Sequence, residues 1–296
     1  MDFGLNNIVD EEALLSFVIS DKRDDFVKMV DNNFVKPITD TKVDELLSLI
    51  HYLDLTSLES TDNKESIKSL IEKATFKYHD LEYRVAGICS FTNLLPFIKE
   101  FNIHKNLKTI VVSAGFPSSQ MPLNAKKEEV RYAIDNGADE IDICINRGMF
   151  LSGEEKGVAN EIFEIKNLIS KYSDSILLKV ILEVGELNTL SNIMKASLIA
   201  LENGADFIKT STGKISQGAD IYSVCVMLLA LRKFYHNQGL LKGLKVSGGI
   251  RTYDEALQYR HLFNIFINEQ IQDNTYFRIG CSRLFENIQE KILNIK

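Results

Sequence analysis

Short apolar runs alternate with longer amphipathic stretches from about residue 51 onward. The apolar runs are rich in β-branched residues and lack polar–apolar alternation, which is typical of strands buried on both faces of a parallel sheet. Between these runs, apolar residues recur at helical spacing, which predicts helices. Asp62 and Glu65 indicate a capping box at the start of the helix that follows the first run. The pattern over Ile221–Tyr235 predicts an amphipathic helix with Cys225 in the core. There are eight apolar runs: His51–Thr56, Arg84–Phe91, Lys108–Ser113, Glu140–Asn146, Ile176–Glu183, Asp206–Ser211, Leu244–Ser247 and Tyr276–Cys281.

Eight β/α units over residues 51–296 are the number and size expected of a (β/α)8 TIM barrel, an α/β fold. A doubly wound open sheet is the alternative, but it seldom needs eight regular repeats, and no GxGxxG motif follows the first strand. Residues 1–50 lie outside the repeat. Their apolar positions predict two or three helices, which form an N-terminal helical extension packed on the outside or the bottom of the barrel.

Two internal repeats place ionisable residues on the predicted strands. The segment NGADEID ends at Asp142 and NGADFIK ends at Lys209, so both residues follow equivalent glycines at the same distance. Alternate strands of a barrel fill the same interior layer, so we expect both side chains to point inward at one height. The second repeat, Lys-x-Ser-x-Gly, starts at Lys209 and at Lys245, on neighbouring strands, and Lys179 lies within a third strand.

Buried lysines in adjacent strands suggest amine chemistry, because an isolated buried ammonium is costly. Burial or a neighbouring cation such as Lys245 lowers the pKa of a lysine, and a neutral Lys209 can form an imine with a carbonyl group. Asp142 is placed to act as the acid and base of that reaction. The alternative is a buried Lys–Asp ion pair without a catalytic role.

Glycine-rich segments follow the last three predicted strands. In a barrel, phosphate is often held by the loops after strands seven and eight, where backbone N–H groups at helix starts face the anion. Lys214 would add positive charge, and Arg283 either adds to it or faces solvent. The alternative for the glycines is that they serve only to make tight turns. The glycines concerned are Gly213, Gly248, Gly249 and Gly280, the last followed closely by Ser282.

Composition narrows the function classes further. The net charge of −7, from 34 Lys and Arg against 41 Asp and Glu, disfavours binding to nucleic acid or to an anionic membrane but leaves room for a small anionic ligand. No apolar run approaches a membrane span, and the acidic N-terminus is not a secretion signal, so we expect a cytoplasmic protein. The four cysteines are far apart and the five histidines scattered, which predicts reduced thiols and no metal or other cofactor.

Seven ordered segments resemble the deoxyribose-phosphate aldolase family, over roughly residues 51–293. The resemblance implies a class I aldolase that reversibly cleaves 2-deoxy-D-ribose 5-phosphate into D-glyceraldehyde 3-phosphate and acetaldehyde without a metal. The segments are LDLT (53–56), VAGICS (85–90), GADEIDICIN (137–146), LKVILEVGE (178–186), GADFIKTSTGK (204–214), KVSGGIR (245–251) and FRIGCS (277–282).

The resemblance also implies roles for single residues. Lys209 falls on the Schiff-base lysine, Asp142 on the proton-relay aspartate and Lys245 on the lysine that perturbs the first. Asp54 and Lys179 fall on polar residues around the site. Two further sets are implied: Cys89 close to the substrate, and Gly213, Lys214, Gly248, Gly249, Gly280 and Ser282 at the phosphate.

Three points stay open in the sequence. Some members of the family end in a tail whose terminal Tyr reaches the site, whereas this chain ends in KILNIK. The resemblance suggests a homodimer, which no surface pattern in the sequence demonstrates. The alternative functions are another Schiff-base sugar-phosphate barrel, similar to transaldolase, and a non-catalytic barrel that binds a sugar phosphate.

Overall fold

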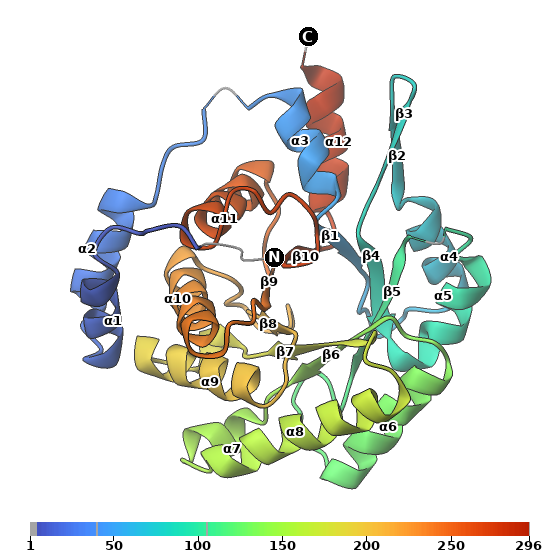
Figure 1. Ribbon diagram of the computed structural model, residues 1–296. Coiled ribbons are helices and arrows are strands. Elements are labelled where there is room, and N and C mark those ends of the chain that lie inside the picture. The colour runs from blue at the N-terminus through green and yellow to red at the C-terminus, as the bar shows by residue number, and fades with distance from the viewer. Residues whose placement is uncertain (1–4, 40, 105, 296) are drawn as a thin grey trace.

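A closed barrel of eight parallel strands forms the centre of the computed structural model, which describes residues 5–39, 41–104 and 106–295 (Figure 1). Each predicted apolar run overlaps one strand, and the strands are hydrogen-bonded in the order β1-β10-β9-β8-β7-β6-β5-β4. The predicted (β/α)8 barrel is therefore confirmed. The strands are β1 Leu53–Thr56, β4 Gly87–Phe91, β5 Lys108–Ser113, β6 Glu140–Cys144, β7 Leu177–Ile181, β8 Phe207–Lys209, β9 Gly243–Ser247 and β10 Phe277–Cys281.

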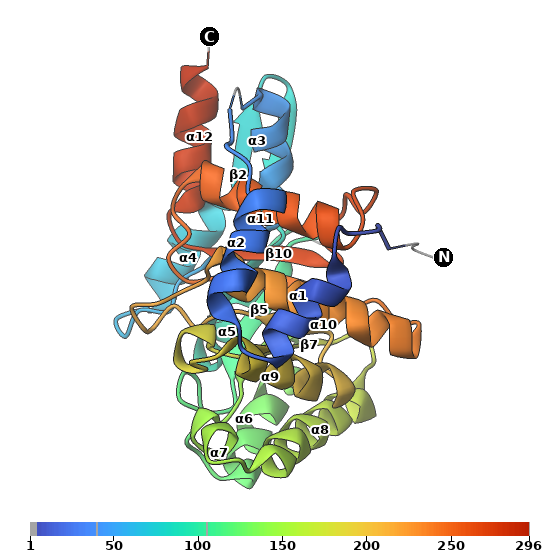
Figure 2. The ribbon, with the colours of Figure 1, turned by 90° about the vertical axis from the view of Figure 1, so that its left-hand side faces the viewer.

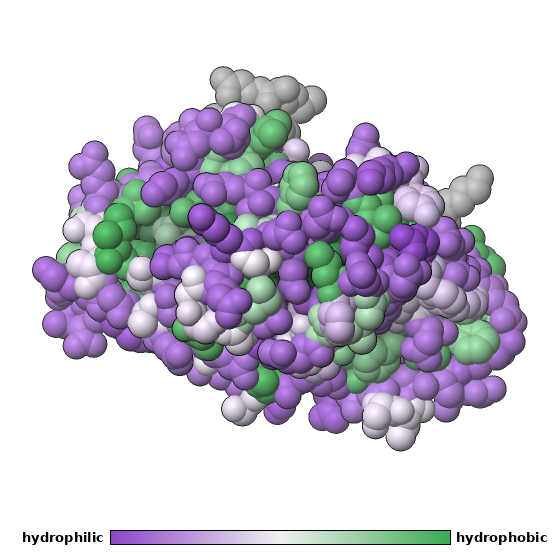
Figure 3. All heavy atoms as spheres, turned by 90° about the horizontal axis from the view of Figure 1, so that it is seen from below, coloured by the Kyte–Doolittle hydropathy of each residue, from purple (hydrophilic) through white to green (hydrophobic). Residues whose placement is uncertain are grey.

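Helices surround the barrel, and the face formed by α6 to α8 is mostly hydrophilic with small apolar areas between (Figure 3). The predicted cap at Asp62 was wrong: Asn63 caps α4, because its side chain accepts hydrogen bonds from the backbone N–H groups of Glu65 and Ser66. These helices are α4 Lys64–Glu72, α5 Leu95–Phe101, α6 Leu123–Asp135, α7 Arg147–Leu151, α8 Glu155–Tyr172, α9 Leu190–Glu202, α10 Ile221–Gln238, α11 Tyr253–Phe266 and α12 Leu284–Asn294, with short 3₁₀ turns at Thr92–Leu94 and Val184–Glu186.

The described part of the first 50 residues contains three helices, α1 Glu11–Ile19, α2 Arg23–Asn33 and α3 Val43–Ile50. In Figure 2, α1 and α2 lie over α9 and α10, and α3 packs against α11 and α12. The sequence predicted that α10 is amphipathic, and this was wrong. Because the extension covers its outer side, α10 is buried on almost all sides. Its inner side faces the barrel and its outer side faces the extension, with Cys225 fully buried as expected.

A two-stranded antiparallel hairpin, β2 Thr75–Tyr78 and β3 Leu81–Arg84, precedes β4 and was not predicted. Arg84, expected to begin a barrel strand, therefore belongs to the hairpin. The barrel strand begins at Gly87, where a Cβ atom would lie 2.6 Å from the side chain of Ile110 on the adjacent strand.

Among the described residues, no helix is long and apolar enough to cross a lipid bilayer.

Candidate active site

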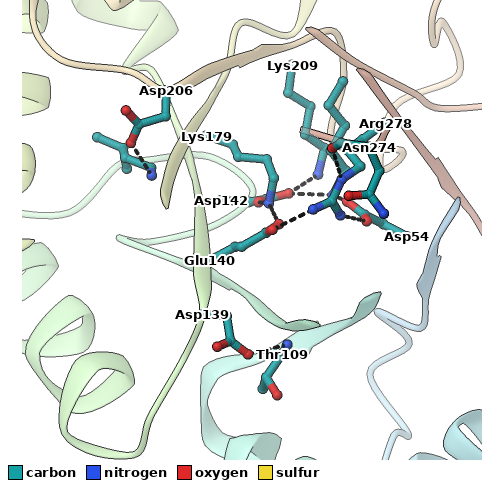
Figure 4. A network of polar contacts seen from close by, with 12 residues as sticks. Asp54, Thr109, Asp139, Glu140, Asp142, Lys179, Asp206, Lys209, Asn274 and Arg278 are labelled. Carbon is teal, nitrogen blue, oxygen red and sulfur yellow. Dashed lines mark hydrogen bonds and ion pairs between the residues drawn. The ribbon is translucent and has the colours of Figure 1, made fainter. Parts of the chain in front are cut away.

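Seven ionisable side chains from six strands meet inside the barrel, and we call them the charged cluster (Figure 4). Each of them is at least 97% buried. Such burial is rare for charged groups unless they are paired, and here every member forms an ion pair with another. The members are Asp54, Glu140, Asp142, Lys179, Lys209, Lys245 and Arg278.

Asp142 is the centre of the charged cluster. One carboxylate oxygen, Oδ2, lies 2.8 Å from Nζ of Lys209 and 2.9 Å from Nζ of Lys245. The other oxygen, Oδ1, lies 2.9 Å from Nζ of Lys179. The predicted inward position of Asp142 and Lys209 at one height is thus confirmed. The register of the sheet brings the three lysines there, since Lys179 is the partner of Asp142 across β6 and β7, and Lys245 that of Lys209 across β8 and β9.

A second group of ion pairs fixes the remaining carboxylates. Nζ of Lys245 also lies 2.7 Å from Asp54, which forms an ion pair with Arg278. Arg278 donates a second hydrogen bond, 2.6 Å long, to Glu140, and Glu140 pairs with Lys179. The charged cluster is therefore one continuous network, in which Lys245 and Arg278 each join two carboxylates.

The network sets the ionisation of its members. Burial alone would raise the pKa of the Asp142 carboxyl, but Lys179, Lys209 and Lys245 hold it well below its usual value. Asp54 behaves in the same way, and its pKa falls to about 2. Burial would lower the pKa of Lys245, but Asp142 and Asp54 raise it well above its usual value. These three groups are therefore ionised at neutral pH.

The charges of the cluster do not cancel. Its four cations face three carboxylates, so one positive charge has no partner carboxylate of its own. Removal of one proton from a lysine would leave the cluster neutral, which lowers the free-energy cost of a neutral amine in this buried place. A neutral lysine is the form that attacks a carbonyl group.

A cavity of about 230 Å³ opens above the cluster at the C-terminal ends of the strands, and Lys209 lines it. Gly213, Gly248 and Gly249 have φ values of +76°, +88° and +82°, which a residue with a side chain rarely adopts. Gly248 is also too crowded for a Cβ atom, which would lie 2.9 Å from Cα of Gly218. All six predicted phosphate residues line this cavity: Gly213, Lys214, Gly248, Gly249, Gly280 and Ser282.

Two predicted contributors stand apart from the cavity wall. Cys89 is fully buried and packs with Leu58 and Ile110, and burial raises the pKa of its thiol. Its proximity to the substrate therefore stays a prediction. Arg283 is exposed before α12. Lys214 does line the cavity, where its ammonium group donates a hydrogen bond to the carbonyl oxygen of Leu58.

Sequence reasoning missed Glu140 and Arg278, although a signal for both was present. Side chains alternate between the two faces of a strand, so residues two apart share a face. Glu140 is two residues from Asp142, and Arg278 is two residues from Gly280, which lines the cavity. Both charged residues should therefore have been expected inside the barrel.

Comparisons with known proteins agree on one family. The family model described as DeoC/LacD family aldolase matches residues 96–261, more than half of the chain. The deoxyribose-phosphate aldolase of Homo sapiens is 35% identical over 259 residues, covering 83% of this chain and 80% of that protein. The Bos taurus deoxyribose-phosphate aldolase is 34% identical over 259 residues, with the same coverage.

The fold is shared with solved structures as well. The tetrameric deoxyribose phosphate aldolase from Aeropyrum pernix superposes with a TM-score of 0.64 at 22% identity, covering 85% of this chain and 97% of that one. The aldolase QR15 gives 0.66 at 26% identity, covering 83% and 96%. The chain is an aldolase, a carbon–carbon lyase, and it belongs to the DeoC/LacD aldolase family.

Proposed function

We propose that this aldolase catalyses the reversible retro-aldol cleavage of 2-deoxy-D-ribose 5-phosphate to D-glyceraldehyde 3-phosphate and acetaldehyde, through a Schiff base on Lys209, in deoxyribose phosphate catabolism. One observation carries the proposal: Lys209 is the member of the charged cluster that also lines the glycine-rich cavity. Its Nζ forms an ion pair with Asp142, and the residue lines the cavity in which a ligand would bind. Curated relatives bear the name of this activity.

The reaction begins with a neutral Lys209. Its Nζ attacks the C1 aldehyde of the open-chain sugar, and loss of water together with uptake of one proton gives a protonated imine. When the C3 hydroxyl gives up its proton, the C2–C3 bond breaks and its electron pair moves into the imine. This step releases D-glyceraldehyde 3-phosphate and leaves an enamine on Lys209. Protonation of the enamine carbon and hydrolysis of the imine release acetaldehyde and restore the amine.

Asp142 is the proposed proton carrier, because its Oδ2 accepts hydrogen bonds from both Lys209 and Lys245. A proton leaving Lys209 can therefore pass within the network without crossing bulk solvent. Lys245 remains a cation, because Asp142 and Asp54 raise its pKa well above its usual value. Asp54 and Lys179 are proposed to hold Lys245 and Asp142 in place through their ion pairs.

The phosphate group is proposed to lie against the glycine segments of the cavity. Backbone N–H groups in turns with positive φ form concave sites for anions. Ser282 and Lys214 would add a hydroxyl donor and a charge. These contacts lie away from the bond that breaks, so they would supply binding that positions the C1 aldehyde at Lys209.

The finer features of the protein are also proposals. No cofactor or metal enters the steps above, and we propose no nucleic-acid or membrane partner. A homodimer and a cytoplasmic location follow from the family and from the sequence, and light scattering of the purified protein tests the first. Residues 1–50 are proposed to be a structural extension of a catalytic barrel formed by residues 51–296.

The test is the release of acetaldehyde from 2-deoxy-D-ribose 5-phosphate, compared with release from 2-deoxy-D-ribose. We expect cleavage of both, with a much lower kcat/KM for the sugar that lacks phosphate. A sugar phosphate that can itself donate a dihydroxyacetone group tests the transaldolase-like alternative. Turnover of that substrate alone would contradict the proposal, and binding of the phosphate sugar without any turnover would favour the non-catalytic barrel.

A further inference from the structure

A second cavity, of about 350 Å³, lies between α11 and the segment that joins α2 to α3. Its walls include Glu45 and Ser48 on α3, the helix that precedes β1, and Gln272 in the loop that precedes β10. It therefore lies at the N-terminal end of the barrel, opposite the end where Lys209 meets the first cavity. The described residues of the charged cluster do not line it. The volume is within the range of small-molecule sites.

Arg260 of α11 lines this second cavity and is 93% buried. Its guanidinium carbon lies 4.5 Å from the ring centroid of Tyr52, and its Nη2 donates a hydrogen bond to the carbonyl oxygen of Ile271. These contacts fix the guanidinium, yet Nη1 has no hydrogen-bond partner. Arg260 forms no ion pair among the described residues, and Asp273 is the carboxylate that acts on it from a greater distance.

Two neighbouring side chains share this condition. Nε2 of His261 and Oδ1 of Asn264 are buried and have no hydrogen-bond partner, and both residues line the same cavity. Positions 260, 261 and 264 lie on one side of α11, since residues four apart in a helix share a face. The three side chains that carry these unpaired polar atoms thus line one cavity, although buried polar atoms are nearly always paired.

The charge of the cavity wall is positive. Lys36 lies close enough to lower the pKa of His261, after the larger effect of burial. The one carboxylate on the wall among the described residues is that of Glu45, which already accepts a hydrogen bond from the backbone N–H of Lys42 at the start of α3. Lys36 and Arg260 therefore face the cavity as cations, and apolar side chains such as Leu257 complete the wall.

We propose that this cavity binds a small organic oxyanion that also carries a hydroxyl group. Nη1 of Arg260 and Nζ of Lys36 would bind the oxyanion, as a carboxylate or as a phosphate ester. Oδ1 of Asn264 would accept the hydrogen bond of the ligand hydroxyl. The proposal is independent of the substrate of the aldolase, because the two cavities share no described residue.

The loop before β10 offers a local readout for this binding. Arg260 holds the loop at Ile271, and Asn274 of the same loop accepts a 2.7 Å hydrogen bond from Arg278. A ligand that binds Arg260 should further stabilise this loop and therefore slow backbone hydrogen exchange in residues 257–274. A phosphate in the first cavity would instead protect the segments around Gly213 and Gly248, so the two events are distinguishable.

The experiment is hydrogen exchange, followed by mass spectrometry, on the full chain with millimolar glycerol 3-phosphate, D-glycerate, methyl phosphate or acetate. We expect protection of residues 257–274 by at least one of the two hydroxyl-bearing probes. Which of these protects distinguishes a phosphate from a carboxylate ligand, and the probes without a hydroxyl should protect less. Lys36→Gln, an exposed site, should weaken binding about tenfold. Lys28→Gln removes the same charge from the exposed side of α2 and should change nothing.

Asn264→Ala supplies the second variant, because Asn264 is half-buried and its backbone contact with Asn6 does not need the side chain. It should reduce binding of the hydroxyl-bearing probes and leave the weaker binding of methyl phosphate unchanged. The absence of protection by all four probes would overturn the proposal. Equal protection in Lys36→Gln and in the parent protein would overturn it too.

Discussion

Asp142 has a position that no other described carboxylate shares, because three lysine ammonium groups lie within 2.9 Å of its oxygens. This arrangement keeps it ionised and supports its proposed role as the group through which protons reach Lys209. It also explains why the sequence pointed to it: Asp142 and Lys209 occupy equivalent positions in two repeated segments. Arg278 does not lie in a repeated segment, so only the alternation of side chains along its strand could have revealed it.

Replacement of Asp142 by Asn preserves the shape of the side chain but removes the proposed proton carrier. We expect Asp142→Asn to lower kcat by roughly 10²–10⁴-fold, the range typical of general acid–base catalysis. Steady-state kinetics with 2-deoxy-D-ribose 5-phosphate measure the effect. Asp139→Asn, on the same segment but bonded to the backbone N–H of Thr109, is the control and should retain most of kcat. An unchanged kcat in Asp142→Asn would contradict the assigned role.

Asp54 predicts how stability depends on pH. Burial would raise its pKa, but Lys245 and Arg278 lower it from 3.8 to about 2. A depressed carboxyl pKa contributes stability above the unfolded value, and that contribution is lost as the pH falls from about 4 to about 2. The contribution is about 2 kcal/mol. Urea unfolding at stepped pH should show a weaker acid dependence in Asp54→Asn than in the parent protein, and an identical dependence would contradict the ion-pair account.

Strands and loops differ in how much of them the sequence predicts. All eight barrel strands were predicted because burial on both faces leaves a continuous apolar run. The β2–β3 hairpin was missed because its strands are short and mostly exposed, as in Leu81–Arg84. The all-round burial of α10 was missed because α2, far away in the sequence, covers it. Local patterns do not contain that information.

The glycine loop after β9 carries a prediction for substrate binding. Gly248→Ala would force a Cβ atom toward Gly218 at a φ of +88°, so the backbone around the phosphate position must shift. We expect KM for 2-deoxy-D-ribose 5-phosphate to rise about tenfold or more, with a smaller change in kcat. Gly153→Ala has a similar φ of +86° but open space around it, so it controls for backbone strain alone. Equal KM values in the two variants would contradict a phosphate site at this loop.

The extension and the barrel form one packed molecule in the part of the chain that the structure describes. Helix α1 is tied to α10 by Glu11, whose carboxylate accepts hydrogen bonds of 2.8 and 2.6 Å from Arg232. Arg232 is 97% buried and also donates to the carbonyl oxygens of Asn6 and Phe266. The extension therefore neutralises a buried charge as well as covering apolar surface.

This contact predicts the effect of the extension on stability. Glu11→Ala leaves the Arg232 guanidinium without a carboxylate partner and should lower the free energy of unfolding by about 1–3 kcal/mol. Glu12→Ala, the exposed neighbour on α1, should change it by less than about 0.5 kcal/mol. Urea denaturation of both variants measures the difference. Equal stabilities would mean that α1 contributes little to the folded barrel.

The central claim for the whole molecule is that Lys209 forms the Schiff base. Borohydride reduction in the presence of acetaldehyde, followed by peptide mass mapping, tests it most directly, because reduction makes an imine permanent. We expect a reduced ethyl adduct on Lys209 in the parent protein and no adduct on the barrel lysines of the Lys209→Ala variant. An adduct on Lys245 or Lys179 instead, or a folded parent protein that gains none, would contradict it.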